Sequence, residues 1–141
     1  MRGMKNLLPK PTLDLLRTDR NALFIDCRSD AEFLLIGHSV VKHSDGQESR
    51  PEQVMWSDEI KMETNPDFVN QVAALSTSKD QTIVIICRSG RRSKLACEAL
   101  EENGFTATVN VLHGFEGDRN NIDQRSSLNG WRFDGLDWEQ L

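Results

Sequence analysis

One short turn of this sequence combines a cysteine, a glycine and three arginines. The run from Ile83 to Ser93 reads IVIICRSGRRS, so that four branched apolar residues are followed at once by Cys87, and Gly90 stands among the arginines. A thiolate is a strong nucleophile, and nearby cations favour it over the neutral thiol. A glycine lets backbone N–H groups curl inward around an anion. The combination predicts a nucleophilic sulfur held beside an anion, whereas a cysteine that only fills space needs none of these neighbours.

The flanking residues predict a strand that delivers Cys87 into a loop before a helix. Four consecutive apolar residues are typical of a strand buried on both faces. From Ser93 to Asn103, the spacing of Leu95, Ala96, Ala99 and Leu100 is helical, and Gly104 is suited to end the helix. A helix N-terminus favours anions. Together with Arg88, Arg91 and Arg92 it should lower the pKa of Cys87 from about 8.5 into a range of roughly 3.5 to 7.5.

The composition describes one globular domain and excludes several functions. The 141 residues are 38% hydrophobic and 28% charged, and the net charge of −5 argues against a nucleic-acid partner. Three cysteines without paired spacing predict reduced thiols, and the three histidines have no metal-ligand spacing with them. We find no signal peptide and no membrane span, so we expect a cytoplasmic protein without a membrane partner.

The first half of the chain adds further predicted elements. Thr12 is placed to cap a short helix that contains Leu13, Leu15 and Leu16. A buried strand at 22–25 ends in Asp26, Cys27 and Arg28. Ser29 and Glu32 then form a capping box that opens a helix through Phe33 to Gly37, before His38 and a weak strand around Val40 and Val41. Residues 42–64 are polar and rich in turns, with a short strand or a packed loop at 54–56.

The second half continues the alternation of strands and helices. Asn65 and Pro66 predict the cap and first turn of a helix whose buried stripe is Phe68, Val69, Val72 and Ala73. A strand at 108–112 ends in His113–Gly117, and the tail returns to the domain through Trp131, Phe133, Leu136 and Trp138. This order predicts an α/β fold with a mostly parallel sheet of about five strands and helices on both faces. The carboxyl ends of the strands would then gather residues 26–28, 87–92 and 113–117 at one edge.

The motifs resemble those of a single-domain rhodanese, a sulfurtransferase. The matching segments are IDCRSDAEFLLIGH, NPDFV, ICRSGRRS and VLHGFEGD, followed by a late GW and GLDW. Two features differ: residues 39–42 read SVVK where the family usually has a proline and an alanine, and HGFEGD with a longer tail resembles a bacterial subgroup. The resemblance implies one rhodanese-like domain over 1–141, with a core of about 12–117 and an extension, 118–141, that packs back.

The resemblance also implies a double displacement without a cofactor. Cys87 would take the outer sulfur of an anionic donor such as thiosulfate as a persulfide, and then pass it to cyanide in an assay or to a thiol or protein acceptor in the cell. The turn, Arg88, Ser89, Gly90, Arg91, Arg92 and Ser93, would bind donor and persulfide. Arg88 and Arg91 are the expected donor-binding residues, while Arg92 is the one that a carboxylate such as Asp26 or Glu32 would hold. Asp26, Arg28, Glu32 and His38 are expected to be structural neighbours of the site.

Two other function classes fit parts of the pattern. A rhodanese-fold phosphatase or arsenate reductase places an arginine six residues after the cysteine, and that residue here is Ser93. A non-catalytic rhodanese-like binding or regulatory module would be signalled by loss of the cysteine, which is present. Of the two interpretations of Cys27, a buried core residue is favoured over a resolving thiol for Cys87. Cys97 is expected to be partly exposed.

Overall fold

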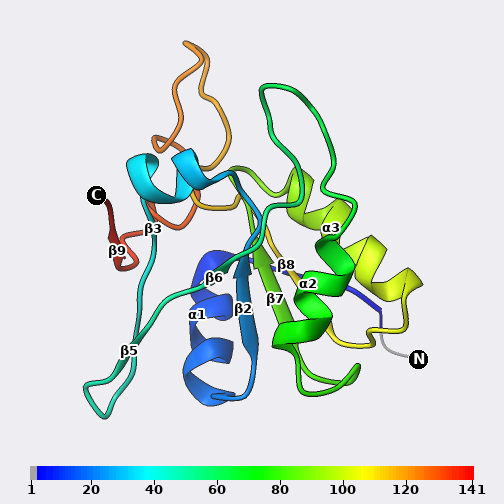
Figure 1. Cartoon of the computed structure of the whole chain (residues 1–141). Helices are drawn as coiled ribbons and strands as arrows, with labels where there is room; N and C mark the ends of the chain where they lie inside the picture. Colours follow the sequence, from blue (N-terminus) through cyan, green and yellow to red (C-terminus); the bar gives the residue numbers. More distant parts are fainter. Residues whose placement is uncertain (1–2) are drawn as a thin grey trace.

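The structure, a computed structural model that describes residues 3–141, is built on a five-stranded parallel sheet (Figure 1). In spatial order the strands are β1 (Lys5–Leu7), β8 (Thr108–Val111), β7 (Ile83–Ile86), β2 (Leu23–Asp26) and β6 (Glu52–Gln53). All four strand pairings are parallel. The predicted α/β fold and the predicted sheet are therefore confirmed.

Helices cover both faces of the sheet. On one face, α1 (Pro9–Thr18) packs against Phe24, Val84 and Val109. On the other face lie α2 (Phe68–Leu75) and α3 (Arg91–Glu102). The strand residues alternate between these two cores because successive side chains of a strand point to opposite faces. This is why uninterrupted apolar runs such as the Ile83–Ile86 run of β7 are fully buried.

The register of β2 and β7 places two cysteines side by side. Asp26 is paired with Ile86, so the next residues, Cys27 and Cys87, leave adjacent strands at the same level. The Cys27 amide donates to the Ile86 carbonyl at 3.0 Å. Both cysteine side chains belong to the core on the α2 and α3 face. Parallel strands thus bring together residues that are 60 positions apart.

The remaining elements are short and lie around this sheet. They are η1 (Glu32–Ile36), a π-helical turn, and four two-residue strands, β3 (His38–Ser39), β4 (Val41–Lys42), β5 (Glu48–Ser49) and β9 (Trp138–Glu139). The strands form two small antiparallel sheets, β3 with β9 and β4 with β5. The expected capping box is confirmed, since the Ser29 amide donates to Glu32 Oε1 and the Glu32 amide donates to Ser29 Oγ, both at 3.3 Å.

Several predicted boundaries were wrong. The first helix begins at Pro9, which needs no N–H donor there, and Thr12 lies inside it and donates to the Leu8 carbonyl. The helix expected at Asn65 begins at Phe68, and the one expected at Ser93 begins at Arg91. Strand β1 was not predicted, because an edge strand of three residues has no periodic signal of its own.

Three predictions about burial, for Cys97, Leu95 and Phe133, were also wrong. Cys97 is fully buried, whereas Leu95 is 47% exposed. The side of α3 that packs on the sheet is set by Ser93, which turns inward to Cys87, and Cys97 lies one turn further along that side. In the tail, Trp131 is fully buried as expected, but Phe133 is half exposed.

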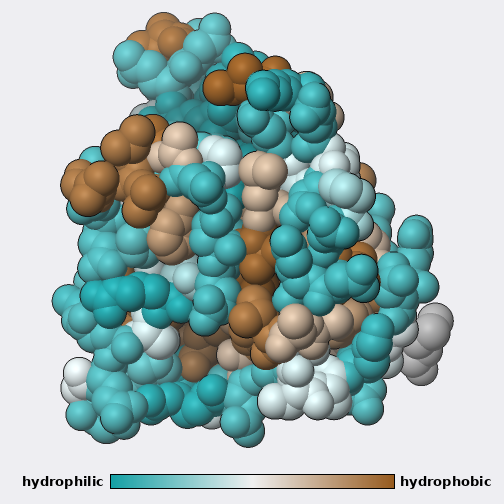
Figure 2. All heavy atoms as spheres, in the orientation of Figure 1, coloured by the Kyte–Doolittle hydropathy of each residue, from teal (hydrophilic) through white to brown (hydrophobic). Residues whose placement is uncertain are grey.

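Two loops rise above the carboxyl ends of the strands, on either side of the turn that leads into α3 (Figure 1). The first spans residues 57–64 and exposes Ile60 and Met62; the second spans 118–130 and exposes Ile122 and Leu128. Apolar patches over these loops and over η1 stand out on a largely hydrophilic face (Figure 2). In the described residues, 3–141, no helix has the length and apolar character needed to cross a membrane.

A fully buried ion pair fixes the end of β2. Asp26 accepts hydrogen bonds from Arg28 Nε at 2.9 Å and from Nη2 at 2.7 Å, and neither side chain is exposed. Arg28 also donates to the Gly37 carbonyl and stacks over the Phe115 ring at 4.6 Å. Burial by itself would lower the pKa of Arg28, but the charge of Asp26 outweighs it and raises the pKa. The pair therefore joins β2, η1 and the segment after β8.

We expect Asp26→Asn to reduce the free energy of unfolding by roughly 3–5 kcal/mol, because it leaves the Arg28 charge buried without its partner. Urea denaturation measures the change. Asp45→Asn is the control, since it removes an exposed ion pair with Arg20 and should leave the unfolding free energy nearly unchanged. Equal effects of the two variants would contradict a stabilising role for the buried pair.

Candidate active site

Cys87 lies at the end of the central strand, in the turn before α3, and is only 1% exposed. Its sulfur accepts hydrogen bonds from the Gly90 amide at 3.1 Å and from the Ser93 amide at 3.3 Å. The Ser93 hydroxyl lies 3.1 Å from the same sulfur. The turn is thus folded around the sulfur, and two of its N–H groups, those of Gly90 and Ser93, point inward.

These contacts make the thiol acidic. Burial by itself would raise the pKa of Cys87. Hydrogen bonds from the Cys27 thiol and from the hydroxyl and amide of Ser93, together with the charge of Arg92, outweigh burial and lower the pKa to about 6. Cys87 is therefore mostly a thiolate at neutral pH, as a nucleophile requires.

Ser93 connects the thiolate to a buried amide. Its oxygen also lies 2.5 Å from Asn110 Oδ1 on β8, so the single hydroxyl proton is donated either to that oxygen or to the thiolate, and Asn110 donates to Asn6 on β1 at 3.1 Å. Ser93 is also the sixth residue after Cys87, the position from which a phosphatase arginine would grip phosphate. A hydroxyl at hydrogen-bond distance from the sulfur occupies that position here.

Two glycines permit the tight course of the backbone. Gly90 has φ of +104°, in the left-handed region that the sequence predicted for it. Gly114 has φ of +60°, and a Cβ on it would lie 2.4 Å from the Cys87 carbonyl oxygen. The Phe115 amide also donates to that oxygen at 2.8 Å. The segment after β8 therefore packs directly against the backbone of the turn at Cys87.

The three arginines of the turn have different surroundings. Arg92 is 3% exposed and donates to both carboxylate oxygens of Glu32 at 2.9 Å, and its Nε lies 2.9 Å from Glu59. Arg88 and Arg91 are 33% and 69% exposed, and their guanidinium groups lie 3.6 and 3.8 Å from Glu59. The expected carboxylate partner of Arg92 is Glu32, not Asp26. Arg88 and Arg91 are the two more exposed arginines of the turn.

Cys27 and Cys97 are buried in the same core cluster as Cys87. Cys27 donates to the Cys87 sulfur, and its own pKa is raised well above the usual value, mainly by burial and then by that bond. Burial likewise raises the pKa of Cys97 to about 12. Both remain thiols at neutral pH, so Cys87 is the only one of the three whose pKa is lowered.

The expected structural neighbours lie beside the turn. His38 Nδ1 contacts the Phe33 carbonyl at 3.1 Å, and Nε2 contacts Glu139 at 2.8 Å. Its ring stacks on Phe33 at 4.1 Å between centroids. Glu32 accepts from Arg92, and this bond outweighs the effect of burial and lowers the pKa of Glu32. These residues support the turn and do not touch the sulfur.

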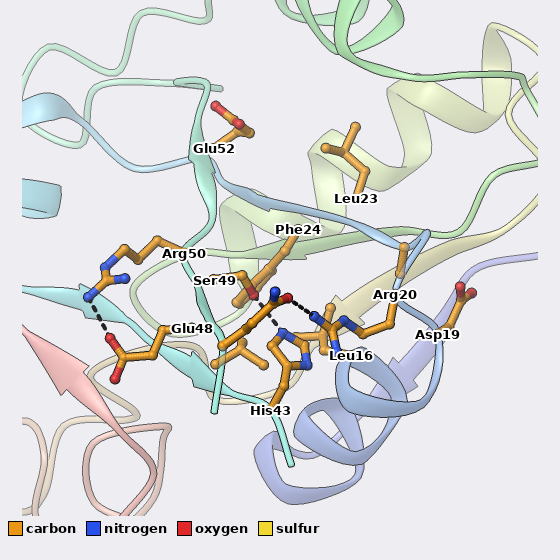
Figure 3. Close-up of a pocket in the computed structure, with 13 residues that line it drawn as sticks. Leu16, Asp19, Arg20, Leu23, Phe24, His43, Glu48, Ser49, Arg50 and Glu52 are labelled. Atoms are coloured by element: carbon orange, nitrogen blue, oxygen red, sulfur yellow. Dashed lines mark hydrogen bonds and ion pairs between the residues drawn. The ribbon is translucent and has the colours of Figure 1, made fainter. Parts of the chain in front are cut away.

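Two cavities help to locate the site. A cavity of about 340 Å³ lies between loop 57–64 and the start of α3, and Glu59, Met62, Arg91 and Leu95 are among its lining residues. Another, of about 290 Å³, lies between α1 and the β4–β5 hairpin (Figure 3). Its polar groups are joined to one another, His43 to Ser49 and Arg50 to Glu48. It includes no cysteine and no residue of the turn, so it is not the reactive site.

The sequence did not identify Glu59 or Asn110 as site residues. Asn110 is a polar residue inside the apolar run TVNV, which is a signal that a buried hydrogen-bond partner exists. Glu59 lies in the polar segment 42–64, where nothing distinguishes it from the neighbouring acidic residues. Only the folded loop shows that it faces the arginines.

Comparisons with known proteins agree with this geometry. The model of the rhodanese-like domain family matches residues 9–120. The uncharacterized protein RC0915 of Rickettsia conorii is 27% identical over 138 residues, which cover 97% of this chain and 98% of that protein. The crystal structure of Rv0390 from M. tuberculosis has a TM-score of 0.84 and 29% identity, with 100% of both chains covered. The polysulfide-sulfur transferase of Wolinella succinogenes shares the fold, with a TM-score of 0.59 and 20% identity over 98% of this chain and 80% of that one.

We expect the rate of Cys87 alkylation by iodoacetamide to rise with pH through an inflection at about 6, because the thiolate reacts and its pKa is lowered. Peptide mass mapping over a pH series measures this rate. Ser93→Ala should move the inflection to higher pH, since the hydroxyl bond to the sulfur is lost. Ser89→Ala, in the same turn, should leave it in place. An inflection near the ordinary thiol value of about 8.5 in the wild type would refute the proposed hydrogen-bonded thiolate.

Proposed function

Since this chain belongs to the rhodanese-like domain family, we propose that it is a sulfurtransferase that acts through a persulfide on Cys87. The sulfur comes from an anionic donor such as thiosulfate and passes to a thiophilic acceptor. The observation that carries this proposal is a buried cysteine whose sulfur accepts hydrogen bonds from the Gly90 and Ser93 amides, in surroundings that lower its pKa to about 6. Such a thiol is ionised without a separate general base.

The first half-reaction is a displacement at sulfur. The Cys87 thiolate attacks the outer sulfur of thiosulfate, a new S–S bond forms, and the S–S bond of the donor breaks. Sulfite leaves with the electron pair, and Cys87 carries an anionic persulfide. Charge is conserved, and no proton, metal or redox cofactor takes part in this step.

The turn has a role in each stage of this step. The amides of Gly90 and Ser93 already bind the Cys87 sulfur. The first N–H groups of α3 have no partner inside the helix, and in this proposal they bind the outer sulfur of the persulfide. Arg88 and Arg91, the two more exposed arginines of the turn, bind the anionic donor and the departing sulfite. Arg92 acts through Glu32 and Glu59, as the residue that positions the turn.

In the second half-reaction an acceptor thiolate, or cyanide in an assay, attacks the outer sulfur of the persulfide. The bond between the two sulfurs breaks, and Cys87 returns to its thiolate form. The same N–H groups stabilise the charge on Cys87 before and after this step, so one turn serves both half-reactions. Cys87 is buried, and we expect the acceptor to approach from the side of Arg88 and Arg91, the two more exposed arginines of the turn.

Incubation with thiosulfate should add one sulfur atom to the wild-type protein, and cyanide should then remove it. Intact mass spectrometry measures both changes. Cys87→Ser should gain no sulfur, because a serine hydroxyl is not ionised at neutral pH and cannot form a persulfide. Cys97→Ala is the matched control and should gain sulfur like the wild type. A gain that persists in Cys87→Ser would refute the assignment of the nucleophile.

We expect Glu59→Gln to lower the KM for thiosulfate severalfold, because the carboxylate lies next to Arg88 and Arg91 and competes with an anionic donor. Steady-state kinetics with cyanide as acceptor measure the change. Glu63→Gln, an exposed residue of the same loop, should leave KM unchanged. If Glu59→Gln raised KM, the carboxylate would instead be needed to position the arginines.

A further inference from the structure

We propose that Cys27 is a resolving thiol, which displaces the outer sulfur of the Cys87 persulfide as sulfide when no acceptor arrives and leaves a Cys27–Cys87 disulfide. The inference rests on the proposed sulfur transfer and adds a second reaction to it, the release of sulfide. The transfer itself uses Cys27 only as a hydrogen-bond donor to Cys87. The sequence favoured a core role for Cys27, and the structure adds its position beside the nucleophile.

The sheet places the two cysteines next to each other. Strands β2 and β7 are paired up to Asp26 and Ile86, and the Cys27 amide extends the ladder by donating to the Ile86 carbonyl at 3.0 Å. Adjacent strands lie about 4.8 Å apart, and the two Cα atoms of a disulfide are usually about 4.4–6.8 Å apart. The backbone can therefore accept a disulfide between Cys27 and Cys87 without a large movement.

Both side chains point to the same face of the sheet. Side chains alternate along a strand, and Cys27 and Cys87 each follow by two positions a residue of the core on the α2 and α3 face, Ile25 and Ile85. The Trp56 amide donates to the Cys27 carbonyl at 2.9 Å, so the backbone of Cys27 is held by both neighbouring segments. Cys27 has no exposed surface. A thiol in this place is shielded from dissolved reagents, whereas the register holds it beside Cys87.

The surroundings of the Cys87 sulfur suit a displacement from the side of β2. Strand β7 lies between β8 and β2. The Ser93 oxygen lies 3.1 Å from the sulfur and 2.5 Å from Asn110 Oδ1 on β8, so Cys27 lies on the other side of Cys87 from this pair. In a displacement at sulfur, the attacking and leaving atoms align on opposite sides of the atom under attack. An outer sulfur bound at the first N–H groups of α3, next to Ser93, would leave on the side opposite Cys27.

The resolving step is balanced without an added reagent. The Cys27 sulfur attacks the inner sulfur of the persulfide, an S–S bond forms between the two cysteines, and the bond between inner and outer sulfur breaks. The outer sulfur leaves with the electron pair and takes the proton of the Cys27 thiol, as HS⁻. The two cysteines are oxidised to a disulfide, and the outer sulfur is reduced to sulfide. An external dithiol then restores both cysteines by thiol–disulfide exchange.

Cys97 is not placed for this reaction, although it is buried in the same cluster. It lies on α3, and Glu101, one turn further along the same side of the helix, accepts a hydrogen bond from Thr108 at 2.8 Å. Thr108 is paired with Ile83, the first residue of β7, whereas Cys87 follows the last. The helix therefore carries Cys97 away from Cys87 toward the other end of the strand. Cys97→Ala is accordingly the matched control.

Anaerobic incubation with thiosulfate, without cyanide or added thiol, tests the proposal. Sulfite and sulfide are trapped with monobromobimane and quantified. In the wild type the persulfide should form and then decay, with about one sulfide released for each sulfite, and peptide mapping without reduction should show Cys27 linked to Cys87. Cys97→Ala should behave like the wild type.

Cys27→Ala should release sulfite, keep the added sulfur on Cys87 and release no sulfide. Cys27→Ser nearly keeps the side-chain volume and a donor beside Cys87 but forms no disulfide, so it should give the same result, and thermal melting checks that both variants are folded. Sulfide release from these variants at the wild-type level would overturn the proposal. A wild-type persulfide that persists without sulfide would overturn it as well.

A second measurement does not depend on thiosulfate. Dipyridyl disulfide, which is neutral, reacts with the Cys87 thiolate, releases thiopyridone and leaves a mixed disulfide from which thiopyridone again departs readily. In the wild type, Cys27 should displace it, so that a second equivalent of thiopyridone appears. Cys27→Ser should release only the first equivalent. A wild type that retains the mixed disulfide would refute the resolving role. If the wild type releases no sulfite from thiosulfate, the proposed function fails, and this measurement still decides the role of Cys27.

Discussion

A negative charge on a buried sulfur is the condition that shapes this molecule. Cys87 is almost inaccessible to water, and an ion in such a place is very costly unless hydrogen bonds replace its hydration. The amides of Gly90 and Ser93 and the thiol of Cys27 supply these bonds. They can do so only if the backbone closes tightly around the sulfur. The left-handed Gly90 and the close approach of Gly114 follow from this requirement.

The three arginines of the turn have two roles in the fold: Arg92 is buried and joins segments, whereas Arg88 and Arg91 face outward. Arg92 is buried between Glu32 of η1 and Glu59 of loop 57–64, so one side chain joins three segments. Burial opposes its charge, but the bonds to Glu32 outweigh burial and raise the pKa of Arg92. Arg88 and Arg91 have longer contacts with Glu59, at 3.6 and 3.8 Å, and are more exposed than Arg92. In a protein of net charge −5, positive charge is thus concentrated around the turn that holds Cys87.

The segment after β8 completes the site from the outside. Phe115 donates to the Cys87 carbonyl and lies under the Arg28 guanidinium, and the fully buried Trp131 anchors the tail on the α1 face of the sheet. Glu139 on β9 accepts from Arg50 and contacts His38, which lowers the pKa of Glu139 to about 2. The C-terminal residues therefore support η1 and the turn, in addition to covering the core.

Local patterns in the sequence determined the parallel α/β sheet, the position of Cys87 at the end of a buried strand, the left-handed Gly90, and the capping box of Ser29 and Glu32. Each of these depends on residues that are near one another in the chain, through strand periodicity, turn chemistry or helix caps. The places of Glu59 and Asn110 were decided by the tertiary structure alone, because these residues reach the site from segments that are 28 and 23 residues from Cys87 in the chain. The burial of Cys97 was decided in the same way. The side of α3 that faces the sheet depends on how the turn holds Ser93 against the thiolate. The hydropathy pattern of the helix does not predict that contact.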